Sequence, residues 1–297
     1  MVQIYNGGKY YVFYFLLLYV VHFILMEYAM PSGYIFYEDN DKVGIITFNS
    51  SNDKTGLLEQ TWILNKNVVP HVAIDTGEDK NICGNCKHRG KVLSLDDAIQ
   101  YAHTLKPHKR RALLKRVETK RTKGLNSINV DRKCYVKTFQ APLSVWKSYK
   151  KGNYEKISLQ KLSKLLAFRF VRVGSYGDPA VIPSEVWDKM LSRTLGNTGY
   201  THQWRKDWAK DFSKCEQKYS KFNMASVDSL EEKRQANKLG YRTFRTRLAS
   251  EPIESDEVVC LSDKVAREGK KLVSCADCMM CSGNNSKVKK NIAIIIH

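Results

Sequence analysis

Acidic residues are scarce in this sequence. The 297 residues include 30 Asp and Glu against 49 Lys and Arg, which gives a net charge of +19 and a pI near 9.5. This imbalance favours polyanionic partners such as a nucleic acid, a nucleotide or an anionic membrane surface. With 43% hydrophobic and 27% charged residues, the composition excludes a disordered or fibrous chain.

Two motifs that would specify a function are missing. The sequence has no Gly-x-x-x-x-Gly-Lys segment, so the polar loop 50–56 between two β-rich runs predicts an ordinary hairpin rather than a P-loop. None of the seven His residues lies two positions from another. This spacing disfavours a replication initiator of the His-hydrophobic-His type.

The chain opens with an apolar run, residues 10–26. At 17 residues it is short for a bilayer span, and it has neither a small-residue cleavage site nor a flanking positive cluster. We expect residues 1–30 to lie outside the fold, as a spurious upstream extension or a hydrophobic leader, and we disfavour a membrane anchor.

Basic residues are concentrated in one segment. Residues 87–133 contain 14 Lys or Arg and 4 Asp or Glu. Helical patterns at 94–105 and 108–123 are separated by Pro107, and the second is strongly basic. We predict a basic helical insertion that either binds a phosphate backbone or presents a solvated charged face.

The rest of the chain alternates strands with helices. Strand patterns at 167–174, 221–227, 241–247 and 291–296, and another that ends in 200–205, are separated by helical ones. This alternation is typical of a parallel sheet. We therefore predict an α/β fold, either a partial (β/α) barrel or an open, mostly parallel sheet, with cysteine-rich metal-binding loops. The predicted units are a leader (1–30), N-terminal strands with a Cys-x-x-Cys (31–86), the basic insertion (87–133), a β/α core (134–259) and a cysteine-rich end with a last strand (260–297).

Polar residues follow several of these strands. Because parallel sheets carry function at the carboxyl ends of their strands, we expect one site there. The candidates for catalysis are Asp178, His202 and Asp228, and those for substrate binding are Tyr176, Gln203, Arg205 and Arg245. Purely structural roles remain open for the three catalytic candidates. Asp178 would form a turn, Asp228 would cap a helix and His202 would pack in the core.

Aromatic and basic residues also alternate at 146–154. This stretch suits either stacking on nucleic-acid bases or an amphipathic helix that covers the core.

Seven of the eight cysteines are clustered. Cys-x-x-Cys spacing in a long chain of this kind favours metal ligation over disulfides. The predicted metal ligands are Cys83, Cys86, Cys134, Cys260, Cys275, Cys278 and Cys281, whereas Cys215 stands alone. The last four are enough to close a zinc site or to hold an iron–sulfur cluster, and spacing does not separate these from each other or from free thiols.

Several longer motifs resemble an uncharacterised protein family of bacteriophages and prophages, known only as a domain of unknown function. The motifs are SSNDKTGLLEQTWIL (50–64), ICGNCKHRG (82–90), CYVKTFQAPLSVWKSYKKGNY (134–154), VRVGSYGDPAVIP (171–183), TGYTHQWRK (198–206), MASVDS (224–229) and GYRTFR (240–245). The resemblance implies a protein of the host-cell cytoplasm but no established activity. The basic segment 87–133 and the apolar leader depart from the family's pattern.

A weaker similarity connects the chain to radical-SAM enzymes. A strand that ends in Gly-x-x-Gly-Asp-Pro, with cysteines ahead of it and one Cys followed by Tyr, looks like their layout, although the usual Cys-x3-Cys-x2-Cys spacing is absent. The similarity implies a [4Fe–4S] cluster held by Cys83, Cys86 and Cys134 with S-adenosylmethionine as cofactor. We thus expect a metalloenzyme that acts on a nucleotide, nucleic acid or other anionic substrate, or alternatively a nucleic-acid-associated accessory protein with structural zinc.

Overall fold

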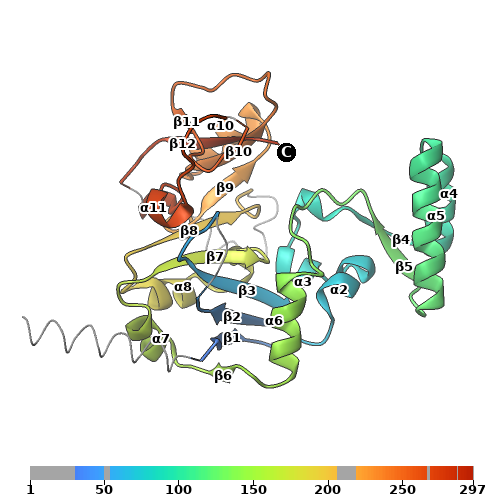
Figure 1. The fold of residues 1–297 in the computed structure, drawn as a ribbon, viewed down its shortest axis with the longest axis horizontal. Helices are drawn as coiled ribbons and strands as arrows, with labels where there is room; N and C mark the ends of the chain where they lie inside the picture. The colour runs from blue at the N-terminus through green and yellow to red at the C-terminus, as the bar shows by residue number, and fades with distance from the viewer. Residues whose placement is uncertain (1–30, 50–53, 206–218, 266–267, 286, 297) are drawn as a thin grey trace, which may run out of the picture.

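A ten-stranded sheet forms the centre of the molecule. The computed structural model describes residues 31–49, 54–205, 219–265, 268–285 and 287–296. Its strands follow the order β11-β12-β10-β9-β8-β7-β3-β2-β1-β6 (Figure 1). They are β1 (Gly33–Glu38), β2 (Lys42–Thr47), β3 (Glu59–Asn65), β6 (Glu155–Lys156), β7 (Phe170–Tyr176), β8 (Gly196–Thr201), β9 (Met224–Val227), β10 (Thr243–Arg247), β11 (Glu257–Val259) and β12 (Asn291–Ile295).

The sheet is mostly parallel and is not closed into a barrel, which confirms the predicted α/β fold with an open, mostly parallel sheet. Among the described strands of this sheet, β1–β2 and β2–β3 are the antiparallel pairs, and the other pairs, β1–β6 and those from β3–β7 to β12–β11, are parallel. The antiparallel pair β2–β3 is the hairpin that the polar loop predicted. All carboxyl ends from β3 to β10 therefore meet at one edge.

Helices follow the strands as the alternating pattern predicted. They are α2 (Pro70–Thr76), α3 (Lys80–Cys83), α6 (Ala141–Lys150), α7 (Leu159–Leu165), α8 (Ser184–Leu191), α10 (Leu230–Lys238) and α11 (Cys275–Cys278). Helix α10 has the local signals that define a helix: Ser229 accepts the Glu232 amide at its start, and Gly240 takes φ +80° after its end. Trp187 of α8 is fully buried and packs against Phe36 and Phe222.

The basic segment folds as a lobe with its own small core. Strands β4 (Lys91–Ser94) and β5 (Ser127–Val130) form a separate two-stranded sheet, which carries helices α4 (Leu95–His103) and α5 (Pro107–Thr122) at one side of the molecule (Figure 1). Leu113 and Val117 of α5 are buried with Ile128 in a hydrophobic cluster distinct from the main one. The lobe joins the body at Asp75 of α2, which accepts the Asn129 amide and pairs with Lys120.

Candidate functional site at the carboxyl edge of the sheet

The Cys-x-x-Cys loop is fastened to the end of strand β8. The Gln203 side chain donates to the Cys83 carbonyl (3.0 Å) and accepts the Asn85 amide (3.2 Å). Gly84 between them has φ +56°, and a Cβ there would lie 2.5 Å from the Gln203 amide group. Glycine is therefore required for this approach. Gln203 positions the loop and is 5% exposed.

Three of the predicted metal ligands come to this loop. Cys83, Cys86 and Cys134 are half-buried and form no disulfide. Burial raises the pKa of Cys83 well above its usual value, and Asp79, Cys134 and Cys86 add to this, so the three thiols lie within electrostatic range of one another. The amides of Lys133 and Cys134 both donate to the His88 carbonyl (3.1 Å each), which holds the distant Cys134 beside the loop.

These thiols are not arranged as ligands around a common point. Among the residues that the structure describes, no three Cys, His, Asp or Glu side chains form a group that could hold a metal ion. The backbone amide of His88 donates a hydrogen bond to the Cys86 sulfur. Burial raises the pKa of this thiol to about 12, and the hydrogen bond opposes the rise.

Tyr176 ends strand β7 next to the same thiols. It is 3% exposed, and its hydroxyl has no hydrogen-bond partner among the described residues. Burial raises its pKa well above the usual value, with further contributions from Cys83 and Asp79. A buried hydroxyl without a partner is uncommon in folded proteins.

Two histidines and an aspartate form a polar cluster beside the thiols. The rings of His88 and His202 meet edge to face with centroids 5.1 Å apart. His88 Nε2 lies 2.9 Å from Asp228 Oδ2, and Lys87 Nζ lies 2.8 Å from the same oxygen. Burial lowers the pKa of His202 to about 4, with the nearby His88 as the next cause. At neutral pH His202 is therefore an uncharged imidazole.

Hydrogen bonds stabilise the ionised form of Asp228. Burial alone would raise its pKa, but hydrogen bonds from His88, Lys87 and Thr246 bring it below the usual range. Asp228 is thus an anchor for the Cys-x-x-Cys loop, and the helix-cap alternative does not describe it, because the N-cap of α10 is Ser229.

Arg205 reaches the same cluster from the other side. Its guanidinium pairs with Glu232 and lies over the Trp204 ring, 4.5 Å from the centroid. Glu232 also binds Lys87 Nζ at 2.7 Å. The charges of Arg205 and Lys87 are therefore balanced at this edge by the carboxylates of Glu232 and Asp228.

Asp178 has the environment of a turn former. It is 6% exposed, and its carboxylate accepts the Thr201 hydroxyl (2.7 Å) and the amides of Ala180 (3.0 Å) and His202 (2.7 Å). Burial raises its pKa to about 6, against the opposing effect of these hydrogen bonds. Both carboxylate oxygens of Asp178 accept hydrogen bonds from the segments that follow β7 and β8. Asp178 therefore positions the His202 backbone instead of facing a substrate.

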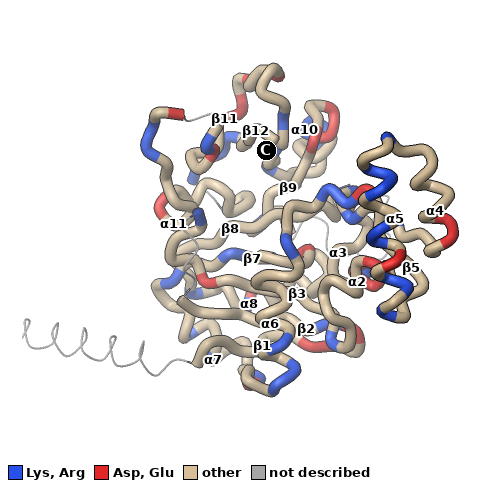
Figure 2. Tube along the Cα trace, turned by 45° about the vertical axis from the view of Figure 1, so that its right-hand side comes forward, with Lys and Arg blue, Asp and Glu red and all other residues tan. Residues whose placement is uncertain are grey.

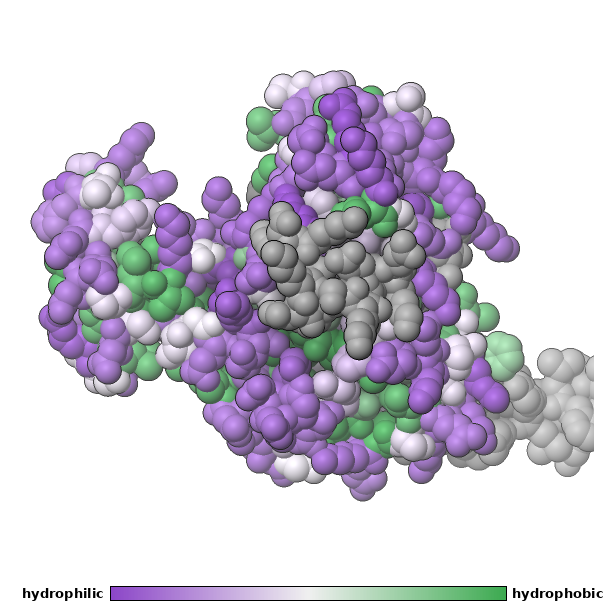
Figure 3. Space-filling view, turned by 180° about the vertical axis from the view of Figure 1, so that it is seen from behind, coloured by the Kyte–Doolittle hydropathy of each residue, from purple (hydrophilic) through white to green (hydrophobic). Residues whose placement is uncertain are grey.

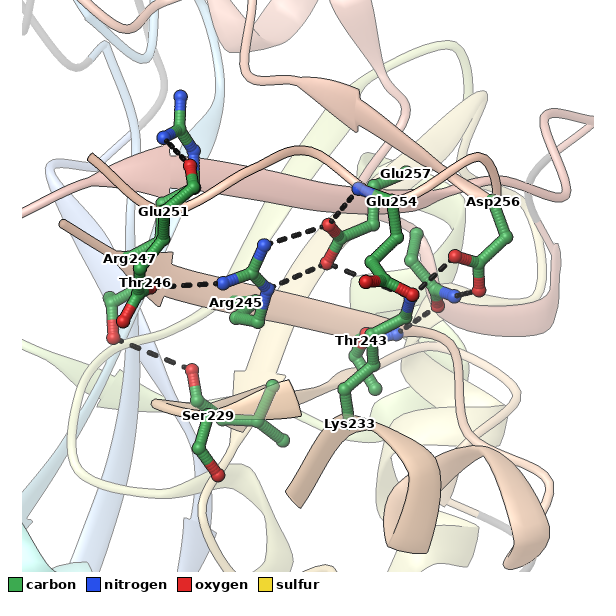
Figure 4. A network of polar contacts seen from close by, with 12 residues as sticks. Ser229, Lys233, Thr243, Arg245, Thr246, Arg247, Glu251, Glu254, Asp256 and Glu257 are labelled. Carbon is green, nitrogen blue, oxygen red and sulfur yellow. Dashed lines mark hydrogen bonds and ion pairs between the residues drawn. The ribbon is translucent and has the colours of Figure 1, made fainter. Parts of the chain in front are cut away.

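Arg245 does not belong to the edge cluster, contrary to the substrate-binding role expected from its place near a strand end. It is 1% exposed, and its Nε and Nη2 each lie 2.8 Å from the Glu257 carboxylate (Figure 4). Nη1 pairs with Glu251 at 3.2 Å. Glu251 lies in the connection between β10 and β11, and Glu257 is the first residue of β11. Arg245 therefore links β10 to this connection and to β11.

Several residues at the edge were not singled out from the sequence. Lys87, His88 and Glu232 belong to it through contacts between distant segments. Two aromatic side chains beside Cys134 are also unusually exposed, Tyr135 by 76% and Phe139 by 66%. The aromatic residues at 146–154 instead pack against the body, with Trp146 Nε1 donating to the Asn65 carbonyl (3.0 Å), which fits the helix alternative.

The other cysteines lie elsewhere or outside the described residues. Cys260, Cys275, Cys278 and Cys281 gather near β8, β12 and α11, and a cavity of about 490 Å³ opens beside Cys278 and Met279. Cys215 and the apolar run 10–26 fall outside the described residues. Within the described part of the chain, no helix is long and apolar enough to cross a membrane.

Comparisons with known proteins add no assignment. A scan against protein-family models, a search of curated proteins and a search of solved structures each found no match.

Proposed function

We propose that the protein is a metalloenzyme of the bacteriophage type that its motifs indicate, with an iron–sulfur centre at the carboxyl edge and a nucleotide, nucleic acid or other anionic substrate. The observation that carries this proposal is the approach of Cys134 to Cys83 and Cys86 from across 47 intervening residues. Carboxyl edges of parallel sheets are the usual place for active sites.

The donor set suits such a centre in number and in chemistry. Three thiolates from Cys83, Cys86 and Cys134 would hold a [4Fe–4S] cluster and leave its fourth iron open, which is the arrangement that serves S-adenosylmethionine chemistry. The unpartnered Tyr176 hydroxyl and the His88 amide on the Cys86 sulfur both favour a bound group here. Rotation of the side chains between staggered rotamers would be needed to bring the sulfurs around it.

The residues around the thiols suit an anionic substrate. Lys87 and Arg205 lie beside the thiols in ion pairs with Asp228 and Glu232, while the neutral His202 can accept a proton and lies against His88. Tyr135 and Phe139 expose their rings next to Lys133 and Lys137, which are exposed as well. Exposed rings among lysines suit stacking on a nucleobase and binding of its phosphate.

Metal analysis of the full chain, purified without oxygen, tests this proposal. We expect a brown protein that contains iron and acid-labile sulfide. A colourless protein that contains zinc alone would overturn the proposal, and it would favour the accessory role described next.

A second function is favoured by the surface of the α4–α5 lobe. The exposed residues of α5 and its flanks are mainly basic, and Figure 2 marks Lys and Arg positions in blue along this part of the trace. They include Lys106, Lys109, Arg111, Lys115 and Lys123. Seen from behind, the lobe is largely hydrophilic (Figure 3). In this alternative the lobe holds a nucleic-acid backbone through its phosphates, and the cysteines are structural.

A further inference from the structure

The C-terminal cysteines are brought together by contacts that are independent of the carboxyl edge. Val273 donates its amide to the Leu261 carbonyl (3.2 Å), and the Ser262 hydroxyl donates to the Val273 carbonyl. These bonds hold the segment that begins with Cys260 beside the segment that leads into Cys275.

Three of the four cysteines are also tied to other parts of the fold. The Cys260 amide donates to the Ala293 carbonyl of β12 (2.8 Å), and the Cys275 amide to the Lys54 carbonyl of the β2–β3 loop (3.0 Å). The Cys278 amide donates to the Ser274 carbonyl (3.0 Å), and the Cys281 carbonyl accepts the Gly199 amide of β8 (3.1 Å). Backbone bonds thus fix Cys260, Cys275 and Cys281, and Cys260 packs against the hydrophobic cluster that contains Cys281.

The turn after Cys278 is strained in a way that serves this convergence. Met279 has φ +49°, a left-handed conformation that a residue with a side chain rarely adopts. It reverses the chain at the end of α11 and brings Cys281 back towards Cys278. Cys281 is then buried with Met224 and Ile292.

Amide groups point at two of the sulfurs. The backbone amides of Ser262 and Met280 donate hydrogen bonds to the sulfurs of Cys260 and Cys278 respectively. Such amide-to-sulfur bonds favour the thiolate and accompany metal–thiolate sites. The same relation joins Cys86 to the His88 amide.

Basic side chains from three elements surround the thiols. Lys54 lies within electrostatic range of Cys260, Arg172 of Cys275 and Arg242 of Cys281. Four thiolates around a divalent ion carry a net charge of −2, which these cations would offset.

We propose that Cys260, Cys275, Cys278 and Cys281 bind one zinc ion as a tetrathiolate site that fastens the C-terminal segment to the sheet. Four ligands close a tetrahedral zinc sphere and leave no open position, as in structural sites. As the thiols are not grouped as ligands in the structure, binding requires their deprotonation and a change of side-chain rotamers. This site is separate from the proposed iron–sulfur centre and does not depend on it.

Zinc content of paired variants tests the proposal. In full-length protein, the double variant Cys275→Ser/Cys278→Ser should lose about one zinc per chain and keep any iron. The matched variant Cys83→Ser/Cys86→Ser, and the single variant Cys215→Ser, should keep the zinc. Unchanged zinc in the first variant, or iron that is lost only from it, would overturn the proposal.

A second measurement on the wild-type chain covers the case in which the first variant does not fold. Alkylation of the cysteines is mapped by mass spectrometry before and after a chelator removes zinc. We expect all four thiols to become reactive together on zinc removal, ahead of unfolding. If the chelator leaves their reactivity unchanged, they do not share a zinc ion, whatever the outcome at Cys83, Cys86 and Cys134.

Discussion

The His88 imidazole lies 2.9 Å from the Asp228 carboxylate and so joins the Cys-x-x-Cys loop to the carboxyl end of β9. The two residues are 140 positions apart in the sequence, and Lys87 reinforces the link at 2.8 Å. This contact and that of Gln203 with Cys83 determine where the thiol loop lies relative to the sheet.

A double-mutant cycle of His88→Gln and Asp228→Asn should show this link as a coupling free energy. Both side chains are about three quarters buried, so we expect about 1 kcal/mol of coupling in the free energy of unfolding, measured with urea. The exposed pair Lys221 and Asp188 is the matched control and should give a coupling close to zero. Equal coupling in the two cycles would show that His88 and Asp228 do not hold the loop.

The buried Asp178 should give a distinct pH dependence. Its pKa is raised from 3.8 to about 6, so the folded state binds a proton more tightly than the unfolded state. As pH falls from 7 to 4, wild type should therefore gain about 2 kcal/mol of stability relative to Asp178→Asn. The measurement is urea unfolding of both proteins across this range. A constant difference for Asp178→Asn would mean that its carboxyl group is not desolvated in the folded protein.

The Arg245–Glu257 pair should be critical for folding. Both side chains are fully enclosed, with exposed fractions of 1% and 0%. Glu257→Gln leaves the guanidinium short of its main partner and should cost about 3–5 kcal/mol of unfolding free energy at pH 7. The double variant Arg245→Met/Glu257→Leu should recover part of this loss, and no recovery would contradict the assignment of the pair.

The same pair has a predictable response to acid. Burial alone would raise the Glu257 pKa, but Arg245 and the Glu254 amide lower it, so the pair stabilises the fold above the ordinary carboxyl pKa and loses its effect as pH falls below it. Wild type should lose stability below about pH 4.3, whereas Glu257→Gln should change less.

Local patterns in the sequence were enough to predict much of the fold. The β2–β3 hairpin, the helix α10 with Ser229 and Gly240 at its ends, and the open parallel sheet all follow from patterns within a few residues of each other. The three-residue strand β11 did not, because it is formed by pairing with β12, more than thirty residues later.

The site was predicted in part, for a related reason. The order of parallel strands put Tyr176, His202 and Asp228 at one edge. The role of His88 depends on a tertiary contact that no local pattern carries. Arg245 was misassigned because its partner Glu257 lies on the unexpected strand β11, so a buried structural ion pair resembled a substrate-binding arginine.

The basic lobe can be tested through the salt dependence of nucleic-acid binding. Arg111→Glu/Lys115→Glu changes two exposed residues of α5. If both contact phosphates, the slope of log affinity against log salt concentration should fall in magnitude by about 2 on duplex DNA. The control Lys161→Glu/Lys164→Glu makes the same charge change on exposed positions of α7. Equal effects of the two variants would mean that α5 is only a solvated face.

The iron and acid-labile sulfide content of Cys134→Ser, purified without oxygen beside wild type, tests the central claim most directly. Cys134 is far from Cys83 and Cys86 in the sequence, so it affects their metal only if the three share it. We predict that this single change removes the iron and sulfide that wild type contains, while Cys215→Ser keeps them. Full iron and sulfide in Cys134→Ser would contradict a centre shared by these three thiolates.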